Sequence, residues 1–222
     1  MTAVDAKDGA IWTRRDRDIV ETLAAKVRML SLAQVARGWW DGAGPRREER
    51  ARATLRMLRR AGLLDEHRVN AHPPPEPRSP VFRWDPGGRD PDPDAEAVAK
   101  RLQDRWTEAA RPTTVFVASP LAANLFGCSG GGLPELTHRD HDLLLGEVFV
   151  RYLTTEPEAA RRWVGEAARP KAGHRVKDPD AFLTDEEGNT LRVVESGGRY
   201  DAERVVAFHE HCAENHLAYE LW

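Results

Sequence analysis

Hydrophobic residues begin to recur at helical spacing shortly after the start of the chain. Ile19, Val20, Leu23 and Val27 fall on one face of a helix that includes the stretch RRDRDIVETLAAKV, because side chains three and four positions apart are neighbours on a helix surface. Thr13 precedes this stretch, and a threonine side chain can accept a hydrogen bond from the free N–H groups of a first helical turn. The pattern predicts an amphipathic helix that begins after Thr13.

Two further helices are predicted after the first. Ser31 can cap the stretch LAQVARGWW, and the sequence DGAGP that follows it is typical of a helix end. The next stretch, RREERARATLRMLRRAG, places Leu55, Met57 and Leu58 inward and is closed by Gly62, since glycine readily takes the left-handed conformation that follows a helix.

Two short apolar runs follow the third predicted helix. They are LLDEHRV and VFRW, with the proline-rich segment HPPPEPRSP between them, and we expect them to pair as a β-hairpin with a long tip. Three helices followed by a two-stranded ribbon resemble a winged helix-turn-helix domain, and LRMLRRAGLLDE is similar to the end of its recognition helix. In that family the third helix lies in the DNA major groove and the hairpin contacts the backbone.

The rest of the chain alternates between helical and strand patterns. WDPGGRDPDPD has the composition of a linker, AEAVAKRLQDRWTEAA is predicted to be helical, and TTVFVAS is predicted to be a strand. FGCSGGGLPEL is interpreted as a loop, because it lacks the Lys-Ser/Thr pair of a phosphate-binding P-loop. From Thr137 onward the predicted elements are a helix (137–153), a helix (157–168), a strand (179–184), a strand (190–195), a helix (201–216) and a strand (217–222).

The composition predicts a soluble protein with an ordinary core. Of the 222 residues, 41% are hydrophobic and 31% are charged, and no apolar run reaches the roughly 18 residues that a membrane span needs. The first residues, MTAVDAKDGA, lack the basic and apolar regions of a secretory signal. Cys128 and Cys212 make no disulfide framework and suit a reducing compartment. We therefore expect a cytoplasmic protein with no membrane partner.

Charge is distributed unevenly along the chain. Residues 1–84 contain 17 Lys and Arg against 11 Asp and Glu, a net of +6, whereas residues 85–222 contain 16 against 25, a net of −9. Arginine neutralises phosphates and can read guanine edges in the major groove, so the arginine-rich third helix is expected to bind double-stranded DNA. The alternative is a solvated arginine-rich helix in a winged helix that serves dimerisation. The arginines concerned are Arg46, Arg47, Arg50, Arg52, Arg56, Arg59 and Arg60.

The order of elements after Thr137 is similar to the core of the PD-(D/E)xK, restriction-endonuclease-like fold, which runs helix, paired strands, helix, strand. Within that superfamily the chain most resembles the replication-relaxation family, whose bacterial members pair a winged helix with a degenerate nuclease-like domain. The matching segments are LRMLRRAGLL, HDLLLGEVFVRYL, DPDAFL and LRVVES. The resemblance implies an α+β fold with a winged helix-turn-helix domain (1–84), a linker and connector helix (85–112) and a nuclease-like α/β domain (113–222).

An active member of that superfamily brings three acids and a lysine together. By position the catalytic acids are Glu147, Asp180 and Glu195, and Asp180 with Glu195 would bind Mg²⁺, which prefers oxygen ligands and activates a water for attack on phosphate. The lysine expected two residues after Glu195 is missing, because Gly197 stands there. Lys177 is the candidate for a lysine that has moved to a neighbouring position.

Each acid also has a purely structural interpretation. Asp180 follows a proline and can bond the backbone at the start of a strand, while Glu195 can pair with Arg192 or Arg199. Burying an acid without partners is costly, so the site is expected to be polar. A binding or structural remnant is favoured over retained nuclease chemistry. We accordingly expect no cofactor, and Mg²⁺ only if the nuclease interpretation holds.

Two groups of histidines have spacings that suggest metal ligands. His141 and Asp142 stand in the order of the His-Asp pair of metal phosphohydrolases, but no further histidine is spaced to complete such a site. His209, Cys212 and His216 fall on one stripe of a predicted helix. Structural zinc sites usually draw their ligands from two chain segments. We therefore expect polar contacts at the first group. At the second we expect no zinc, and packing of Val205, Phe208, Cys212 and part of the histidine stripe on the sheet.

Together these features predict a DNA-binding regulator of transcription, or of replication and mobile elements. It is expected to act as a homodimer, because paired winged helices bind paired half-sites. The first alternative is a magnesium-dependent DNA endonuclease that is targeted by its winged helix. The second alternative is an adaptor whose acidic C-terminal domain binds a partner protein.

Overall fold

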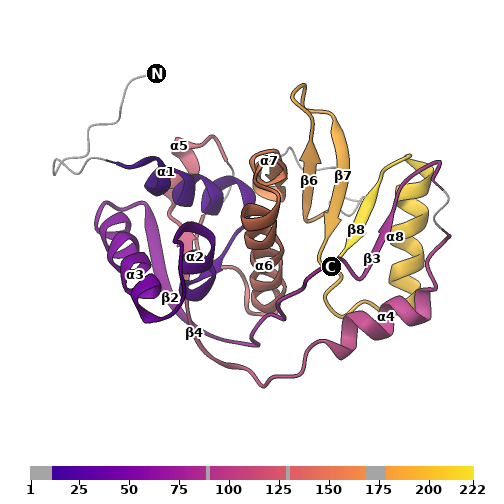
Figure 1. Cartoon of the computed structure of the whole chain (residues 1–222), viewed down its shortest axis with the longest axis horizontal. Coiled ribbons are helices and arrows are strands. Elements are labelled where there is room, and N and C mark those ends of the chain that lie inside the picture. Colours follow the sequence, from indigo (N-terminus) through magenta and orange to yellow (C-terminus); the bar gives the residue numbers. More distant parts are fainter. Residues whose placement is uncertain (1–11, 89–90, 129–130, 169–178) are drawn as a thin grey trace.

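The computed structural model describes residues 12–88, 91–128, 131–168 and 179–222, which form a mixed α+β fold. Within these ranges there are two sheets, one of three strands and one of five. The sheets lie on either side of the long helix α6 (Arg139–Thr155) (Figure 1). No helix among the residues described has the length and apolar character needed to cross a membrane.

The first helix of the described chain is capped at its N-terminus. The helix α1 (Arg14–Glu21) begins at Thr13, whose hydroxyl accepts a hydrogen bond from the Asp16 N–H at 3.2 Å, while the Asp16 carboxylate accepts one from the Thr13 N–H at 2.9 Å. This reciprocal pair satisfies two donors that a first helical turn leaves free. Ile19 is fully buried, as the predicted apolar stripe requires. The helix continues into a π-helical turn, η1 (Thr22–Lys26).

The next two helices agree with the sequence pattern. The helix α2 (Leu32–Trp39) begins at Ser31, whose side chain caps the first turn. The helix α3 (Pro45–Arg60) starts with a proline, whose missing N–H costs nothing in a first turn. Leu55, on the inner side of α3, is fully buried. Gly62 follows with a φ of 74°, the left-handed conformation that ends a helix at low steric cost.

A three-stranded sheet packs with α1, α2 and α3, and these helices and the sheet together are called the N-terminal half. Its strands are antiparallel and run in the order β1-β4-β2. They are β1 (Leu30–Ser31), β4 (Arg111–Ala118) and β2 (Leu64–Ala71). The predicted hairpin between LLDEHRV and VFRW is therefore wrong in its second strand, because TTVFVAS takes that place and pairs with β2 along all eight of its residues.

The run VFRW forms β3 (Phe82–Trp84), which pairs with the last strand, β8 (Tyr219–Leu221), in the other sheet. The rings of Phe82 and Trp84 lie 6.0 and 5.9 Å from the ring of Tyr219. Aromatic pairs across neighbouring strands stabilise a sheet, and this contact is available only when β3 joins β8. The chain between β2 and β4 thus crosses to the second sheet and returns.

The five-stranded sheet has the order β3-β8-β7-β6-β5. The β7–β8 pair is parallel, and the other pairs are antiparallel. Helices α4 (Ala95–Asp104) and α8 (Ala202–Glu214) share a second hydrophobic core with this sheet, and Figure 1 shows them at the far end of the molecule from α3. The other three strands of the sheet are β5 (Trp163–Gly165), β6 (Ala181–Thr184) and β7 (Thr190–Glu195).

Two predicted helices are shorter than expected. The helix predicted over 157–168 is wrong in its second half, where α7 (Pro157–Arg161) gives way to β5 and the 3₁₀ turn η3 (Glu166–Ala168). Trp163 is only 2% exposed and packs edge-on against a ring of α6, so tertiary contacts decide the conformation here. The helix predicted for AEAVAKRLQDRWTEAA ends early, at Asp104.

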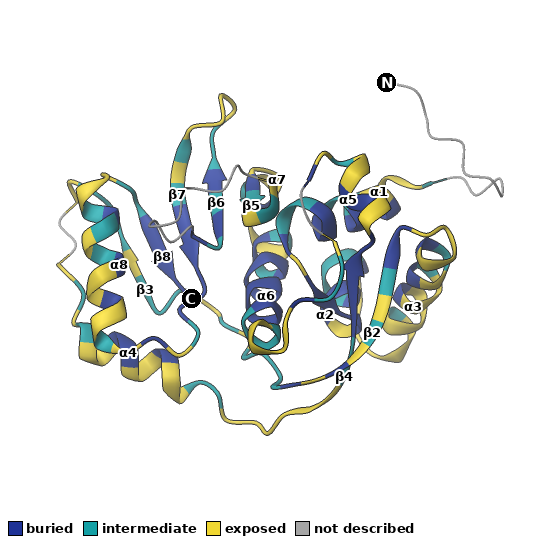
Figure 2. Ribbon diagram, turned by 180° about the vertical axis from the view of Figure 1, so that it is seen from behind, coloured by how far each residue is buried: buried dark blue, intermediate teal, exposed yellow. Residues whose placement is uncertain are grey.

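One hydrophobic core runs through both halves of the molecule. It joins α1, α2 and α3 to α6 and continues to Trp163 and Trp222, and Figure 2 shows buried segments on both sides of α6. The predicted divisions at 1–84, 85–112 and 113–222 do not match this arrangement. β3 lies in the C-terminal sheet, whereas β4 lies in the N-terminal one. The remaining short elements are α5 (Pro120–Leu125) and η2 (Leu136–His138).

Candidate functional site

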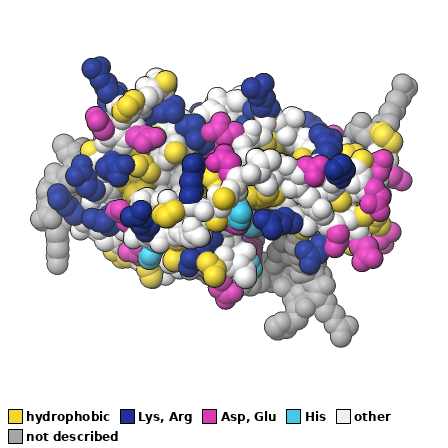
Figure 3. Space-filling view, turned by 90° about the horizontal axis from the view of Figure 1, so that it is seen from below, with side chains coloured by type: hydrophobic (Ala, Val, Ile, Leu, Met, Phe, Trp, Pro, Cys, Tyr) yellow, Lys and Arg dark blue, Asp and Glu magenta, His cyan; other side chains and the backbone are white. Residues whose placement is uncertain are grey.

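Positive charge is concentrated on the outer surface of α3. Lys and Arg side chains gather at the end of the molecule that contains this helix, and acidic side chains are frequent at the opposite end (Figure 3). Of the seven predicted DNA-binding arginines, only Arg47 is half-buried. The exposed ones are Arg46, Arg50, Arg52, Arg56, Arg59 and Arg60. The buried side of α3 faces the core, so the arginines can reach an external ligand without unfolding the helix.

Two of the seven arginines are engaged within the protein. The Arg47 guanidinium donates a hydrogen bond to the Gly42 carbonyl at 2.9 Å, and Arg59 forms an ion pair with Glu66 of β2 at 2.6 Å. The side chains of the other five form no hydrogen bond or ion pair with the residues that the structure describes. Those five are Arg46, Arg50, Arg52, Arg56 and Arg60.

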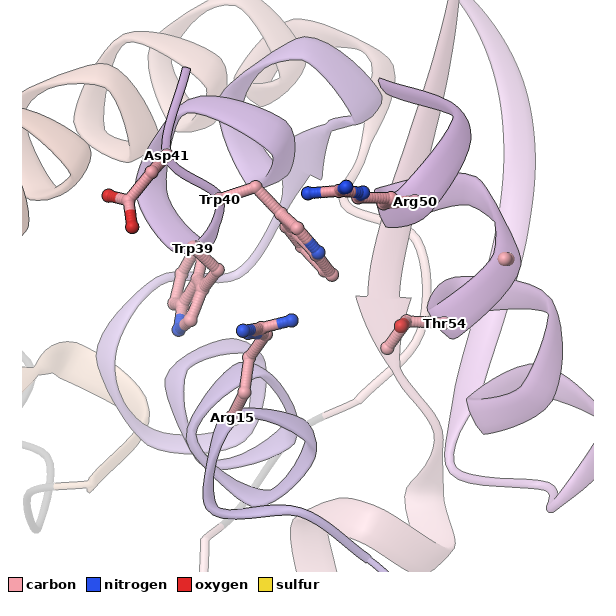
Figure 4. Close-up of a pocket in the computed structure, with 7 residues that line it drawn as sticks. Arg15, Trp39, Trp40, Asp41, Arg50 and Thr54 are labelled. Atoms are coloured by element: carbon pink, nitrogen blue, oxygen red, sulfur yellow. The ribbon is translucent and has the colours of Figure 1, made fainter. Parts of the chain in front are cut away.

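An open cavity of about 450 Å³ lies beside α3. It is formed by the start of α1, the end of α2 and the middle of α3, and Figure 4 shows the side chains that line it. Arg15 lies over the Trp40 ring, with its central guanidinium carbon 4.8 Å from the ring centroid. The seven lining residues are Arg15, Trp39, Trp40, Asp41, Arg50, Ala53 and Thr54.

The sequence analysis did not single out Arg15 or the two tryptophans as site residues. The signal that was available is the pair Trp39-Trp40 at the end of a short helix, preceded by the basic cluster that starts α1. Large aromatic side chains in adjacent positions cannot both face the core of one helix. Trp40 is 7% exposed, whereas Trp39 is half-buried and donates from Nε1 to the Asp18 carboxylate at 2.6 Å.

The acids Asp180 and Glu195 do lie together in the second sheet. The Asp180 N–H donates to Glu195 Oε2 at 3.2 Å, and the Ser196 N–H donates to Asp180 Oδ2 at 2.7 Å. The Tyr200 hydroxyl donates to Glu195 Oε1, and the Glu195 side chain is fully buried. Each acid therefore accepts a hydrogen bond from the backbone, and Glu195 also accepts one from the Tyr200 hydroxyl.

Glu147 does not join these two acids. It lies on the side of α6 that faces α2, where Arg37 contacts both of its carboxylate oxygens at 2.5 Å and the Gln34 amide donates to Oε2 at 3.0 Å. Burial raises the pKa of Glu147, and the charge of Arg37 and the Gln34 hydrogen bond oppose that rise. The predicted three-acid cluster is thus not formed, because Glu147 serves the contact between two helices.

His141 takes the place beside Asp180 that was expected for Glu147. Its Nε2 lies 2.9 Å from Asp180 Oδ2, and its Nδ1 lies 3.3 Å from Asp142 Oδ1. Burial alone would lower the pKa of His141, but the two carboxylates outweigh it and raise the pKa to about 10. The expectation of polar contacts at this helix start is confirmed. The partner Asp180, 39 positions away, could not be read from spacing.

The donor set around Asp180 and Glu195 fits Mg²⁺ poorly. A magnesium site needs carboxylate oxygens that are free to coordinate, whereas here protein N–H and O–H groups bond both carboxylates. The imidazolium of His141 already supplies a positive charge at Asp180. The described geometry therefore supports a cluster held by internal hydrogen bonds to Asp180 and Glu195 better than a metal centre.

Gly197, which stands where a lysine was expected, is closely packed against a neighbouring helix. A Cβ atom added to Gly197 would lie 2.8 Å from Leu102 Cδ1 of α4, closer than carbon atoms in van der Waals contact. Helix α4, part of the crossing segment between β2 and β4, thus packs over the position two residues after Glu195. The other candidate, Lys177, lies outside the described residues.

The histidine–cysteine stripe of α8 packs against the second sheet. Cys212 is fully buried, and burial raises the pKa of its thiol to about 12. His209 lies between Asp92 at 3.2 Å and the Tyr219 hydroxyl at 3.0 Å, while His216 is exposed. The expected packing on the sheet is confirmed for Cys212 and His209, whereas His216 lies beyond the end of α8. The absence of zinc stays a prediction.

Comparisons with models of protein families, with curated proteins and with solved structures found no match to this chain.

Proposed function

We propose that the protein is a DNA-binding regulator that places α3 in the major groove of duplex DNA. The observation on which this rests is the exposed face of α3, where five arginines have no partner among the described residues. The seven arginines of α3 outnumber its two acids, Glu48 and Glu49, and a polyanion would neutralise this excess of positive charge. A helix of this kind can contact phosphates and base edges together.

The order of elements supports the same proposal. Helix α1, strand β1, helices α2 and α3, and then the antiparallel strands β2 and β4 follow one another in the N-terminal half. This is the order in which a winged helix-turn-helix presents its third helix to the groove. The strand β4 takes the place that the sequence pattern predicted for β3, so the assignment depends on a segment that begins 29 residues after the start of β3.

The wing differs from a short hairpin. The chain between β2 and β4 contains β3 and α4, which belong to the second sheet and its core. A connection held in this way is not a free loop that can settle into a minor groove. We therefore assign DNA recognition to α3, with the wing strands serving to hold that helix.

The nuclease alternative is not favoured by the site geometry. Glu147 is bonded to Arg37 of α2, and Asp180 and Glu195 accept hydrogen bonds from protein N–H groups. Leu102 of α4 packs against Gly197. The C-terminal half then acts as a body that holds the N-terminal half through the shared core. We propose further that the protein acts on transcription, or on replication and mobile elements, as a homodimer.

The test compares two sets of three arginines with equal loss of charge. Arg46→Ala, Arg50→Ala and Arg56→Ala together should weaken duplex binding and lower the slope of log K against log salt by about 3, because each lost phosphate contact lowers it by about 1. Arg59 is left intact because it pairs with Glu66. Fluorescence anisotropy with a labelled duplex at several salt concentrations measures both quantities.

The control replaces three exposed arginines at the other end of the molecule, Arg101, Arg199 and Arg204. This variant should keep the wild-type salt slope. Equal slopes in all three proteins would remove α3 from the interface. In the same preparation, plasmid DNA with magnesium or manganese should not be nicked. Nicking that disappears in both Asp180→Ala and Glu195→Ala would instead establish the endonuclease.

A further inference from the structure

The cavity beside α3 brings together two arginines from different helices. Arg15 comes from the first turn of α1 and Arg50 from the second turn of α3, and both guanidinium groups point toward the Trp40 indole (Figure 4). Neither guanidinium has a carboxylate partner among the residues described. Two cations that line one cavity repel each other, and an anion bound between them would relieve that repulsion.

Trp40 fixes the orientation of Arg15. The guanidinium lies 4.8 Å from the indole centroid, within the range of a cation–π contact. A guanidinium stacked on a ring keeps its N–H donors in its own plane, where they can form two parallel hydrogen bonds to phosphate oxygens. Because Trp40 is 7% exposed, the ring is held by the core and cannot easily turn away.

The charge of the cavity suits a phosphodiester. Arg15 and Arg50 contribute two positive charges, and Asp41, which also lines the cavity, contributes one negative charge. The net charge of +1 matches the single negative charge of a backbone phosphate better than the nearly double charge of a phosphate monoester. The Thr54 hydroxyl on the same wall adds one neutral donor.

We infer that Arg15 and Arg50 clamp one backbone phosphate of the DNA beside the groove that α3 occupies, with Trp40 as the positioning residue for Arg15. Arg50 belongs both to the exposed face of α3 and to the cavity wall. DNA that contacts this face therefore passes the mouth of the cavity. This inference rests on the proposed function and adds α1 to its interface.

The experiment compares Arg15→Gln with Arg14→Gln in duplex binding at several salt concentrations. Both variants lose one charge from the exposed first turn of α1, but only Arg15 lines the cavity. Arg15→Gln should bind about tenfold more weakly, as expected for one lost charge-assisted contact. Its salt slope should fall by about 1. Arg14→Gln should stay close to the wild type in both measurements.

The role of Trp40 is tested by a double-mutant cycle. Trp40→Leu should weaken binding in the wild-type background but not in the Arg15→Gln background, and Trp40→Phe should restore most of the affinity because it keeps a ring face. Thermal unfolding checks that each variant folds. If Trp40→Leu does not fold, the comparison of Arg15→Gln with Arg14→Gln still decides whether the clamp exists.

The failures of the two proposals can be told apart. Wild-type protein that binds no duplex at low salt would overturn the proposed function and the clamp with it. Wild-type binding with equal behaviour of Arg15→Gln and Arg14→Gln would overturn the clamp alone. Unchanged DNA binding in Arg15→Gln, together with loss of tryptophan quenching by free ATP, would assign the cavity to a small phosphate ligand and also overturn the clamp.

Discussion

At the residue scale, four charged groups that are buried or partly buried are linked in one cluster by hydrogen bonds. His141 lies between Asp180 and Asp142, and Asp180 is joined to Glu195 through its own N–H. Removing any one member leaves a buried partner unsatisfied, which costs about 1–3 kcal/mol for each lost hydrogen bond. Glu195→Ala is therefore expected to destabilise the fold, because Tyr200 and the Asp180 N–H would lose their acceptor.

The raised pKa of His141 predicts a loss of stability at alkaline pH. Its pKa rises from 6.5 to about 10 on folding, so protonated His141 stabilises the fold fully below pH 6.5, and this contribution is lost as the pH rises through about 10. The side chain is 32% exposed, and solvent screening reduces the effect to the order of 1–3 kcal/mol. Urea unfolding at pH 6.5 and pH 10 measures the loss.

The control for this prediction is His141→Gln, which cannot be protonated but keeps an amide donor for Asp180. The free energy of unfolding of this variant should fall less between the two pH values than that of the wild type. The difference between the two proteins isolates His141 from Lys26 and the cysteines, which also titrate at alkaline pH. Identical losses in the two proteins would contradict the assignment of the pKa shift.

At the element scale, the π-helical turn η1 and the strand β5 are packed backbone to backbone. The Trp163 indole donates to the Lys26 carbonyl at 3.0 Å, and the Lys26 ammonium donates to the Ala160 carbonyl at 2.7 Å. Gly165 approaches the same turn so closely that an added Cβ would lie 2.3 Å from the Lys26 carbonyl oxygen. This contact ties the N-terminal helices to the edge of the five-stranded sheet.

Gly165→Ala is expected to destabilise the protein by about 2–4 kcal/mol, because the methyl group would meet backbone atoms that cannot rotate away. Denaturant unfolding at neutral pH measures this change. The neighbouring Val164 is half-buried, and Val164→Ala is expected to cost about 1 kcal/mol or less. Equal effects of the two substitutions would show that β5 does not approach the turn this closely.

At the scale of the whole molecule, the crossing segment between β2 and β4 interleaves the two halves. β3 and α4 lie with the second sheet, while β4 returns to the centre of the first one. The main core continues from α1 through α6 to Trp222. The strands of the two sheets therefore alternate along the chain, and the two sheets with their helices are expected to unfold together.

A fragment of residues 12–84 is expected to lack a stable fold, because it is missing β4 and α6. Without β4 the first sheet loses its central strand, and without α6 the apolar faces of α1 and α2 lose their cover. Circular dichroism should show no cooperative thermal transition for this fragment and one transition for the full chain. A fragment with its own cooperative transition would restore the domain boundary that the sequence had suggested at Trp84.

Local sequence information determined most of the helices. The caps at Thr13 and Ser31, the proline that begins α3 and the glycine that follows it act within a few residues of themselves. Their effect is therefore visible in a short window of sequence. The exposure of the arginines on α3 also followed from sequence, because the spacing of Leu55 and Leu58 already assigns the opposite side of the helix to the core.

Tertiary structure alone decided the partners that lie far apart along the chain. VFRW and TTVFVAS are both apolar enough to pair with β2. In the fold, TTVFVAS pairs with β2 along eight residues, and VFRW packs its aromatic rings on Tyr219. Glu147 and His141 both lie on α6, but which of them meets Asp180 depends on how that helix is rotated between α2 and the second sheet. Such choices compare the energies of contacts between distant segments, and these energies are absent from any local pattern of residues.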